Sequence, residues 1–281
     1  MIRRKLKYFA EYISLRLSVL LLSPLTASSN KSLIFFLLKI IKPRKKLIFK
    51  QLKMVFPEKS GVWLEKTIDE FYYNLASLAV EFFFVAWDKT EIKINNQENF
   101  DKAISFKRGV ILVSGHIGNW ELCMAHIAKN TTTSGIVKSV KNPLVDGYIN
   151  RKREKANVGV IYLKNIFRQT IRAMKNRELV CIMLDQNARN FGVRIPFLGH
   201  KASTFISPAK LAIKTGAVLL PAFSTRERAT ITTHYLTPIT TENFTDDEES
   251  IIQLTRVVNQ KLEEMILKYP SQWFWIHKRW S

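Results

Sequence analysis

From residue 109 onward, short apolar segments alternate with amphipathic ones, and this alternation constrains the fold more than any other feature of the chain. Short apolar runs bounded by turn residues predict strands, and apolar residues spaced three and four apart predict helices. Strands that alternate with helices form a mostly parallel sheet whose faces are covered by helices. The sequence therefore predicts an α/β fold with a mostly parallel central sheet flanked by helices.

The expected elements can be placed along the chain from this pattern. Predicted strands are residues 110–113, 136–140, 158–163, 179–184, 193–197, 217–223 and 229–236. Predicted helices are residues 62–87, 118–128, 144–156, 165–176 (with Asn165 as N-cap), 207–215 and 246–268. Ser207-Pro208 is a typical helix start, Gly216 a typical stop, and the acidic residues 246–249 complement the positive N-terminal end of the last helix.

The N-terminal residues differ from the rest because they combine basic and apolar character. Basic residues at 3–7 precede an apolar run at 15–25 that Arg16 interrupts and Pro24 ends. This run is too short for a confident membrane span of about 20 residues. Residues 42–53 interleave basic and apolar side chains, which suits an anionic membrane surface, although a solvated helix face remains the alternative. We predict a membrane-anchoring helical region at residues 1–54, interfacial or marginally spanning, followed by a catalytic domain at 55–281.

The charge balance limits the possible partners. The chain has 44 Lys and Arg against 23 Asp and Glu, a net charge of +21. Such a field attracts nucleic acid, an anionic lipid surface or an acidic protein. No zinc-finger spacing, RNP-like strand or long basic helix is present, so we expect no nucleic-acid partner. Cys123 and Cys181 lie in apolar stretches, which predicts buried free thiols in a reducing compartment.

A histidine and a carboxylate flank the turn after the first buried strand. His116 follows the strand, and Glu121 lies one turn into the next helix. Ligands of α/β sheets gather at the carboxyl ends of strands. His116 could accept a proton from an alcohol while Glu121 holds the other ring nitrogen, and N–H groups at the helix start could face a developing oxyanion. A His and a Glu at this spacing also occur by chance, and in that case they are structural.

Five blocks of the sequence resemble the lipid A biosynthesis acyltransferases (lauroyl and myristoyl transferases), a branch of the glycerolipid-type H-x4-[D/E] acyltransferases. Gly-His-Ile-Gly-Asn-Trp-Glu at 115–121 matches the family's histidine block. Phe-Pro-Glu at 56–58, the Arg153 and Gly159 pair, residues 185–204, and the Gln-Trp-Phe-Trp-Ile-His-Lys-Arg-Trp stretch at 272–280 agree in order and spacing. The resemblance covers the whole chain.

The resemblance implies transfer of a fatty acyl group from acyl-acyl carrier protein to a hydroxyl of a lipid A precursor. It implies a place at the cytoplasmic face of the bacterial inner membrane, an acidic carrier protein and an anionic glycolipid as partners, and neither cofactor nor metal. The site residues expected from it are catalytic His116 and Glu121, with Arg153, Asp185, Gln186 and Asn119 at the substrate.

Two of these residues have alternative roles. Arg153 could grip a phosphate or carboxylate with its planar fork, or be one of several surface cations at 151–153. Asp185 could bind a sugar, position Arg153, or cap a loop. Two other functions remain open: acyl transfer to another polar lipid, such as a phosphoinositide mannoside or an aminolipid, and a non-catalytic basic protein that binds membranes or nucleic acid.

Overall fold

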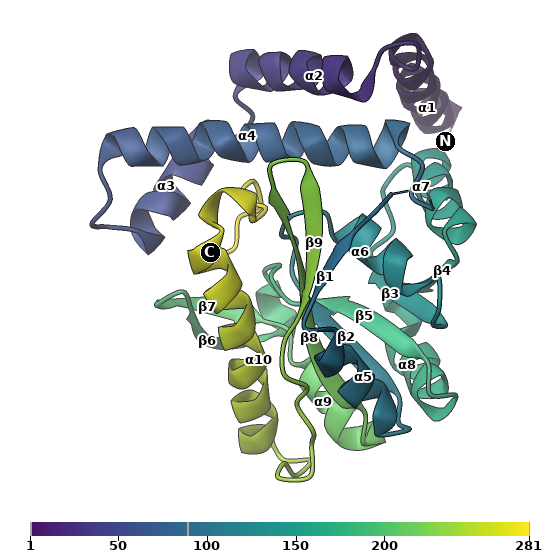
Figure 1. The fold of residues 1–281 in the computed structure, drawn as a ribbon, viewed down its shortest axis with the longest axis vertical. Helices are drawn as coiled ribbons and strands as arrows, with labels where there is room; N and C mark the ends of the chain where they lie inside the picture. The colour runs from purple at the N-terminus through teal and green to yellow at the C-terminus, as the bar shows by residue number, and fades with distance from the viewer. Residues whose placement is uncertain (1, 89, 281) are drawn as a thin grey trace.

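The computed structural model describes residues 2–88 and 90–280, whose strands and helices alternate over most of the chain (Figure 1). The strands are β1 (Lys93–Asn95), β2 (Val110–Ser114), β3 (Thr133–Val137), β4 (Val158–Tyr162), β5 (Leu179–Met183), β6 (Val193–Phe197), β7 (His200–Thr204), β8 (Val218–Glu227) and β9 (Thr230–Tyr235). The helices are α1 (Ile2–Leu22), α2 (Ala27–Ile41), α3 (Lys45–Val55), α4 (Gly61–Phe84), α5 (Gln97–Ser105), α6 (Trp120–Ile127), α7 (Pro143–Lys155), α8 (Ile166–Lys175), α9 (Ser207–Thr215) and α10 (Glu248–Lys268). Short 3-10 turns are η1 (Leu163–Asn165), η2 (Arg189–Phe191) and η3 (Pro270–Gln272).

A seven-stranded sheet forms the centre of the molecule, in the order β1-β9-β8-β2-β5-β3-β4. The run from β8 to β4 is parallel throughout. β9 pairs antiparallel with β8, and β1 lies parallel to β9. The predicted α/β fold with a mostly parallel sheet is therefore confirmed. β6 and β7 form a separate antiparallel hairpin.

Two apolar clusters fill the two faces of this sheet. In β2, Ile111 and Val113 belong to the larger cluster, whereas Val110 and Leu112 belong to the smaller one. This division follows from the alternation of side chains along a strand. The helices α3, α4, α9 and α10 contribute to the larger cluster, and α5 and α6 to the smaller. All five residues of β2 are buried, as expected for a central parallel strand.

Most predicted elements are present, and the helix signals lie where expected. The Oδ1 atom of Asp247 accepts the backbone N–H of Ser250 at 2.9 Å and so caps the acidic start of α10. Gly216 ends α9 with a φ of +66°. The strand predicted at 136–140 is displaced, because β3 covers 133–137. The segment at 200–204, expected only as part of a motif, forms the strand β7.

The N-terminal helices pack on the outer side of α4 and α7. α2 lies along α4, and α1 lies beside α7 (Figure 1). Both helices expose large apolar side chains to solvent, namely Leu6, Phe9, Ile13, Leu17, Leu20, Leu21, Leu33, Phe36, Leu37, Ile40 and Ile41. Over the described residues, no helix is both long enough and apolar enough to cross a bilayer.

Helix α3 joins the core that the rest of the chain forms. Ile48 and Leu52 are fully buried in the larger apolar cluster. The side chain of Gln51 donates to the backbone carbonyls of Trp275 at 2.8 Å and His277 at 3.0 Å. The predicted boundary between residues 54 and 55 thus falls within a helix that packs against the C-terminal segment. The division into two domains stays a prediction.

Candidate active site

Two loops at the carboxyl edge of the parallel strands form the candidate site. β2 ends at Ser114 in register with Met183, the last residue of its neighbour β5. Because parallel neighbours end on the same edge of a sheet, the loops that follow them lie side by side. The first loop carries His116, and the second carries Asp185.

His116 and Asp185 are joined by two hydrogen bonds. The ring Nδ1 of His116 lies 2.8 Å from Oδ1 of Asp185, and the backbone N–H of His116 donates to Oδ2 at 2.8 Å. The indole N–H of Trp273 donates to the same Oδ2 at 2.9 Å. Since Nδ1 faces a carboxylate, the imidazole carries its proton there, and Nε2 is left as the atom that can accept another proton.

Burial and charge act in opposite directions on the pKa of His116. Burial of the ring lowers the pKa, but the charge and hydrogen bond of Asp185 outweigh burial and raise it above its ordinary value. Burial raises the pKa of Asp185, yet His116 and the indole of Trp273 hold that pKa well below its usual range. Asp185 is therefore ionised at neutral pH, and it stabilises the imidazolium that forms when Nε2 takes up a proton.

Glu121 does not hold the imidazole, so the partner predicted for His116 is wrong. The carboxylate of Glu121 instead accepts two hydrogen bonds from Arg153, from Nε at 2.9 Å and from Nη2 at 2.5 Å. The physical reason is direction: Glu121 lies in the first turn of α6 and faces α7, whereas the ring of His116 faces the loop after β5. The charge of Glu121 still raises the pKa of His116.

Arg153 binds a carboxylate with its planar guanidinium, which is one of the two roles considered for it. That carboxylate is Glu121 of the protein itself and not a substrate group. The third nitrogen of the Arg153 guanidinium, Nη1, donates to Oδ1 of Asn150 at 3.0 Å. The ion pair with Glu121 raises the pKa of Arg153, although burial lowers it. The alternative in which Asp185 positions Arg153 is wrong, because the Asp185 carboxylate is held by His116 and Trp273.

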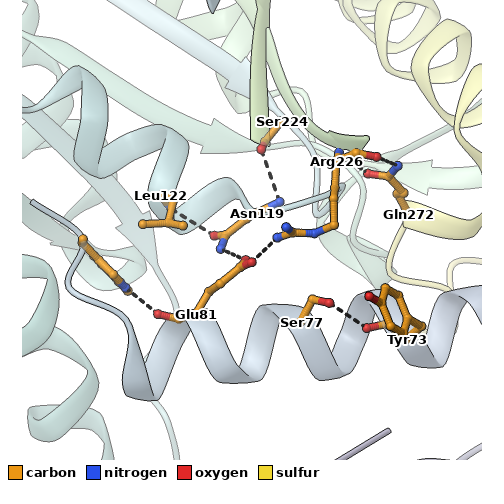
Figure 2. A network of polar contacts seen from close by, with 9 residues as sticks. Tyr73, Ser77, Glu81, Asn119, Leu122, Ser224, Arg226 and Gln272 are labelled. Carbon is orange, nitrogen blue, oxygen red and sulfur yellow. Dashed lines mark hydrogen bonds and ion pairs between the residues drawn. The ribbon is translucent and has the colours of Figure 1, made fainter. Parts of the chain in front are cut away.

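The loop between His116 and Glu121 is fixed by a network of polar contacts (Figure 2). Asn119 is buried and caps α6, because its Oδ1 accepts the N–H of Leu122 at 3.0 Å. Its Nδ2 donates to Glu81 of α4 at 2.6 Å, and Glu81 also forms an ion pair with Arg226 of β8. Both polar atoms of the Asn119 side chain are thus engaged with the protein.

The same network reaches the backbone of the loop. The side chain of Gln272 bonds the N–H and the C=O of Arg226, both at 2.7 Å, and the C=O of Gln272 accepts the N–H of Gly118 at 3.1 Å. Gly118 has a φ of +58°, and a Cβ there would lie 2.3 Å from the carbonyl oxygen of Ser224. Only glycine fits this position. The helix-start amides of Gly118, Asn119 and Leu122 are therefore occupied by Gln272, Ser224 and Asn119.

A buried arginine at the C-terminus supports the loop after β5. Arg279 is fully buried, and it donates to the C=O of Gln186 at 3.4 Å and to Oγ1 of Thr204 at 2.7 Å. Nε2 of His277 accepts the N–H of Asn187 at 3.0 Å. The C-terminal motif thus holds the chain on the far side of Asp185. The side chain of Gln186 is half-buried beside the site.

The side chain of His116 is partly exposed, whereas its partner Asp185 is enclosed. The side chain of His116 is 19% exposed, against 3% for Asp185. The rings of Trp120 and Phe274 flank the imidazole at centroid distances of 4.8 Å and 6.1 Å. A substrate that approaches Nε2 therefore passes aromatic side chains, which favours a molecule with apolar parts.

The site contains neither a reactive thiol nor a metal-binding cluster in the part of the chain that the structure describes. Cys123 and Cys181 are buried free thiols, as predicted, and burial raises the pKa of Cys123 to about 11. Across residues 2–88 and 90–280, no three His, Cys, Asp or Glu side chains are arranged to hold a metal ion. The proton-transfer group that this arrangement provides is His116.

Four residues that matter to this geometry were not expected from the sequence in their present roles. Trp273 holds Asp185, and Glu81, Arg226 and Gln272 hold the histidine loop. Trp273 and Gln272 lie in the C-terminal motif, so the motif was the available signal for them. Glu81 sits in an otherwise apolar stretch of α4, and a carboxylate in such a stretch is a signal for a buried pair.

A family model described as bacterial lipid A biosynthesis acyltransferase matches residues 3–281. The phosphatidylinositol mannoside acyltransferase of Mycobacterium tuberculosis is 28% identical over 134 residues, which are 46% of this chain and 42% of that protein. The lipid A biosynthesis lauroyltransferase of Escherichia coli is 26% identical over 179 residues, 62% of this chain and 57% of that protein. These matches span less than two thirds of the length of either relative.

One solved structure is also similar in part. The crystal structure of the 1-acyl-sn-glycerophosphate acyltransferase from Thermotoga maritima has a TM-score of 0.42 and 16% sequence identity. The match covers 86% of this chain and 96% of that one.

Proposed function

This chain belongs to the bacterial lipid A biosynthesis acyltransferase family, and from that premise we propose that it transfers a fatty acyl group to a hydroxyl of a lipid. The observation that carries the proposal is the contact between Nδ1 of His116 and the buried carboxylate of Asp185. An imidazole oriented in this way is a general base toward an alcohol, a role that contributes about 10²–10⁴ in rate.

The proposed reaction is a direct attack on a thioester. Nε2 of His116 takes the proton of the acceptor hydroxyl as its oxygen bonds to the thioester carbonyl carbon. The carbon–sulfur bond then breaks, and the imidazolium returns the proton to the leaving thiolate. Asp185 stays ionised throughout and stabilises the imidazolium. The products are an ester and a free thiol, and no acyl group is attached to the enzyme.

We assign different work to the other residues expected at the substrate. Glu121 and Arg153 form one buried ion pair that fixes α6 against α7. Asn119 caps α6 and fixes the loop to α4, so it acts as a positioning residue. Gln186 borders the Asp185 loop and is the residue of this set that remains available to contact the acceptor.

Acyl-acyl carrier protein is the proposed donor, and a lipid A precursor is the proposed acceptor. A net charge of +21 attracts both an acidic carrier protein and an anionic glycolipid. We propose the cytoplasmic face of the bacterial inner membrane as the location. Residues 1–54 would serve as the membrane-anchoring region and residues 55–281 as the acyltransferase domain. The exposed apolar side chains of α1 and α2, beside basic residues, support a position in the membrane interface.

A second acceptor has specific support. Relatives named phosphatidylinositol mannoside acyltransferase match this chain at 24–28% identity, as closely as the lipid A enzymes do. A phosphoinositide mannoside or another polar lipid would use the same histidine. Mass spectrometry of lipids from a deletion strain separates the two acceptors. Loss of one acyl chain from lipid A supports the first, and unchanged lipid A with an altered second lipid supports the other.

The reaction itself is tested with the purified protein. Labelled acyl-acyl carrier protein and a lipid A precursor are supplied in detergent micelles, and acylated product is counted. We expect His116→Ala to abolish transfer while vesicle binding persists. The matched control is His126→Ala at the end of α6, whose buried Nδ1 makes no hydrogen bond within the described chain. Near-native turnover of His116→Ala would refute the proposed mechanism.

A further inference from the structure

A cavity of about 430 Å3 opens between α2, α4 and the turn that joins β8 to β9. We call it the α2–α4 cavity. Three cationic side chains line it, Lys31, Arg226 and Arg228, together with the ring of Tyr73 and one carboxylate, Glu70. Its volume is that of a small-ligand site and not of a protein-docking surface. The hairpin of β8 and β9, which supplies both arginines, reaches up to the middle of α4 (Figure 1).

The charge in this cavity is not balanced by the protein. Nζ of Lys31 lies 5.0 Å from the centroid of the Tyr73 ring. Among the described residues, neither Lys31 nor Arg228 forms an ion pair with a carboxylate. The carboxylate of Glu70 pairs with Lys66 instead, at 4.0 Å. Arg226 is paired with Glu81 through one nitrogen only. Several N–H donors of positive groups therefore remain for an anion with more than one oxygen.

Arg226 connects the cavity to the loop that carries His116, and Figure 2 shows its contacts with Glu81 and Gln272. The side chain of Gln272 forms hydrogen bonds with the backbone N–H and C=O of Arg226. Gln272 also lines the cavity, and its backbone C=O accepts the N–H of Gly118. Gly118 lies two residues after His116 in the same loop. A molecule bound in the cavity would thus contact Arg226 and Gln272, which hold the loop that carries His116.

The cavity is lined in part by α2, the helix whose exposed apolar side chains we propose to contact the membrane. Lys31 belongs to α2, whose Phe36, Ile40 and Ile41 are 61–68% exposed on the outside of the molecule. If that apolar side contacts acyl chains, basic residues near it meet the phosphate layer. The ring of Phe35 packs edge-on against Tyr73 at 5.5 Å and joins the apolar side of α2 to the cavity wall.

We propose that the α2–α4 cavity binds a phosphate of the headgroup of the lipid acceptor, which orients the acceptor so that its hydroxyl reaches His116. The inference rests on the proposed acyl transfer and adds a recognition site to it. Lys31 and Arg228 contact the phosphate, and Tyr73 borders it. Phosphorylated lipids are then preferred over the same lipids without phosphate, whatever their sugar.

The test compares one lipid A precursor before and after phosphatase treatment, with the native protein and Lys31→Gln/Arg228→Gln. For the native protein, removal of phosphate is expected to raise the KM for the acceptor about tenfold or more, with kcat little changed. The double variant is expected to have a similarly raised KM for the intact acceptor and to lose the preference. Lys210→Gln/Arg256→Gln, on α9 and α10, neither of which lines the cavity, is the matched control with the same loss of charge.

The possible outcomes distinguish failure of the phosphate site from failure of the proposed acyl transfer. Absence of transfer to either acceptor by the native protein rejects the acyltransferase proposal itself. Equal use of both acceptors by the native protein rejects the phosphate site alone. A raised KM for the acyl donor only, with the acceptor preference intact, would assign the cavity to the carrier protein and overturn the inference.

A second variant tests the site without the risk that the double variant misfolds. Ala229 is exposed in the turn between β8 and β9 and lines the cavity, so Ala229→Glu adds a negative charge there without disturbing the core. It is expected to raise the KM for the phosphorylated acceptor and to leave the KM for the dephosphorylated one unchanged. Equal effects on both acceptors would contradict the inference.

Discussion

At the scale of single residues, the proton affinity of His116 depends on Asp185. Without the Asp185 carboxylate, only the charge of Glu121 would oppose the effect of burial, so Asp185→Asn is expected to lower the pKa of His116. His116 is a base only when neutral, and activity rises with pH through its pKa. The acid limb of kcat/KM should therefore lie above 6.5 in the native protein and shift to lower pH in the variant, with the plateau reduced about 10²–10⁴-fold.

A weaker change at the same site gives a graded control. Trp273→Phe removes one donor to Asp185 and keeps an aromatic ring in the core. We expect a smaller loss of turnover than in Asp185→Asn, with an acid limb close to that of the native protein. If Asp185→Asn left the acid limb unmoved, Asp185 would not be the group that sets the pKa of His116.

The ion pair of Glu121 and Arg153 makes a separate prediction about stability. The two side chains are 7% and 16% exposed, so loss of one partner leaves a buried, unpaired charge. Glu121→Ala is expected to lower the free energy of unfolding by about 3–5 kcal/mol. The double variant Glu121→Leu/Arg153→Met should lose much less, because no charge is stranded. Urea unfolding measures both, and equal losses would show that the pair acts independently of its charge.

The sequence predicted the local part of this site, whereas Asp185 was expected there only from the family resemblance, without its contact with His116. His116, the glycines and the helix start lie within a few residues, so their arrangement follows from strand, turn and helix signals. Asp185 binds His116 from 69 residues away along the chain, and Trp273 binds Asp185 from 88 residues away. The sequence predicts Glu121 as the partner of His116 only because the two residues are close along the chain. Nothing local shows that the two side chains face different neighbours.

At the scale of secondary structure, the pair of Glu81 and Arg226 couples α4 to the histidine loop. The side chains are 14% and 12% exposed. Glu81→Gln keeps the shape and can still accept from Asn119, but it leaves Arg226 uncompensated. We expect a loss of about 3 kcal/mol in unfolding free energy and a roughly tenfold lower kcat, with the donor KM little changed.

An exposed ion pair that also involves α4 is the matched control for this change. Lys39 of α2 and Asp69 of α4 lie 2.8 Å apart, with side chains nearly half exposed. Lys39→Gln should change the free energy of unfolding by less than about 1 kcal/mol and leave kcat unaltered. Similar effects of Glu81→Gln and Lys39→Gln would mean that α4 does not position the loop.

Elements with a strong pattern were predictable, and short ones were not. β2 and β5 are buried apolar runs, and α9 and α10 have clear start signals. β1 has only three residues, none of them buried, so no apolar pattern marks it. β7 is stabilised by pairing with β6, which is a tertiary contact within a turn-rich stretch.

At the scale of the whole molecule, local patterns predicted the fold class but not the order of strands. β2 sits between β8 and β5, which are separated from it by many residues. β9 reverses direction because a tight turn at Arg228 and Ala229 joins it to β8. Such pairings depend on which apolar faces meet in the folded chain. Local sequence patterns do not contain that information.

The whole molecule also combines a high positive charge with an apolar outer side on α1 and α2, and the two features make distinct predictions about membranes. Binding to vesicles that contain anionic lipid should exceed binding to neutral ones and weaken as salt rises, because exposed charges are screened. Ile40 is 62% exposed on α2. Ile40→Ser should weaken vesicle binding about tenfold at any salt, since burial of such a side chain contributes roughly 1.5–3 kcal/mol.

Ile104→Ser is the matched control, since Ile104 is 40% exposed and belongs to α5, which lies well away from α2 in the lower half of Figure 1. Vesicle sedimentation at low and high salt separates the two contributions. If α2 contacts the lipid, the variant of α2 loses affinity and the variant of α5 does not. Equal binding by both variants would place the membrane contact elsewhere on the molecule. Because salt screens charge and leaves apolar burial largely intact, binding that persists at high salt in the native protein and disappears in Ile40→Ser would identify the apolar side of α2 as the anchor.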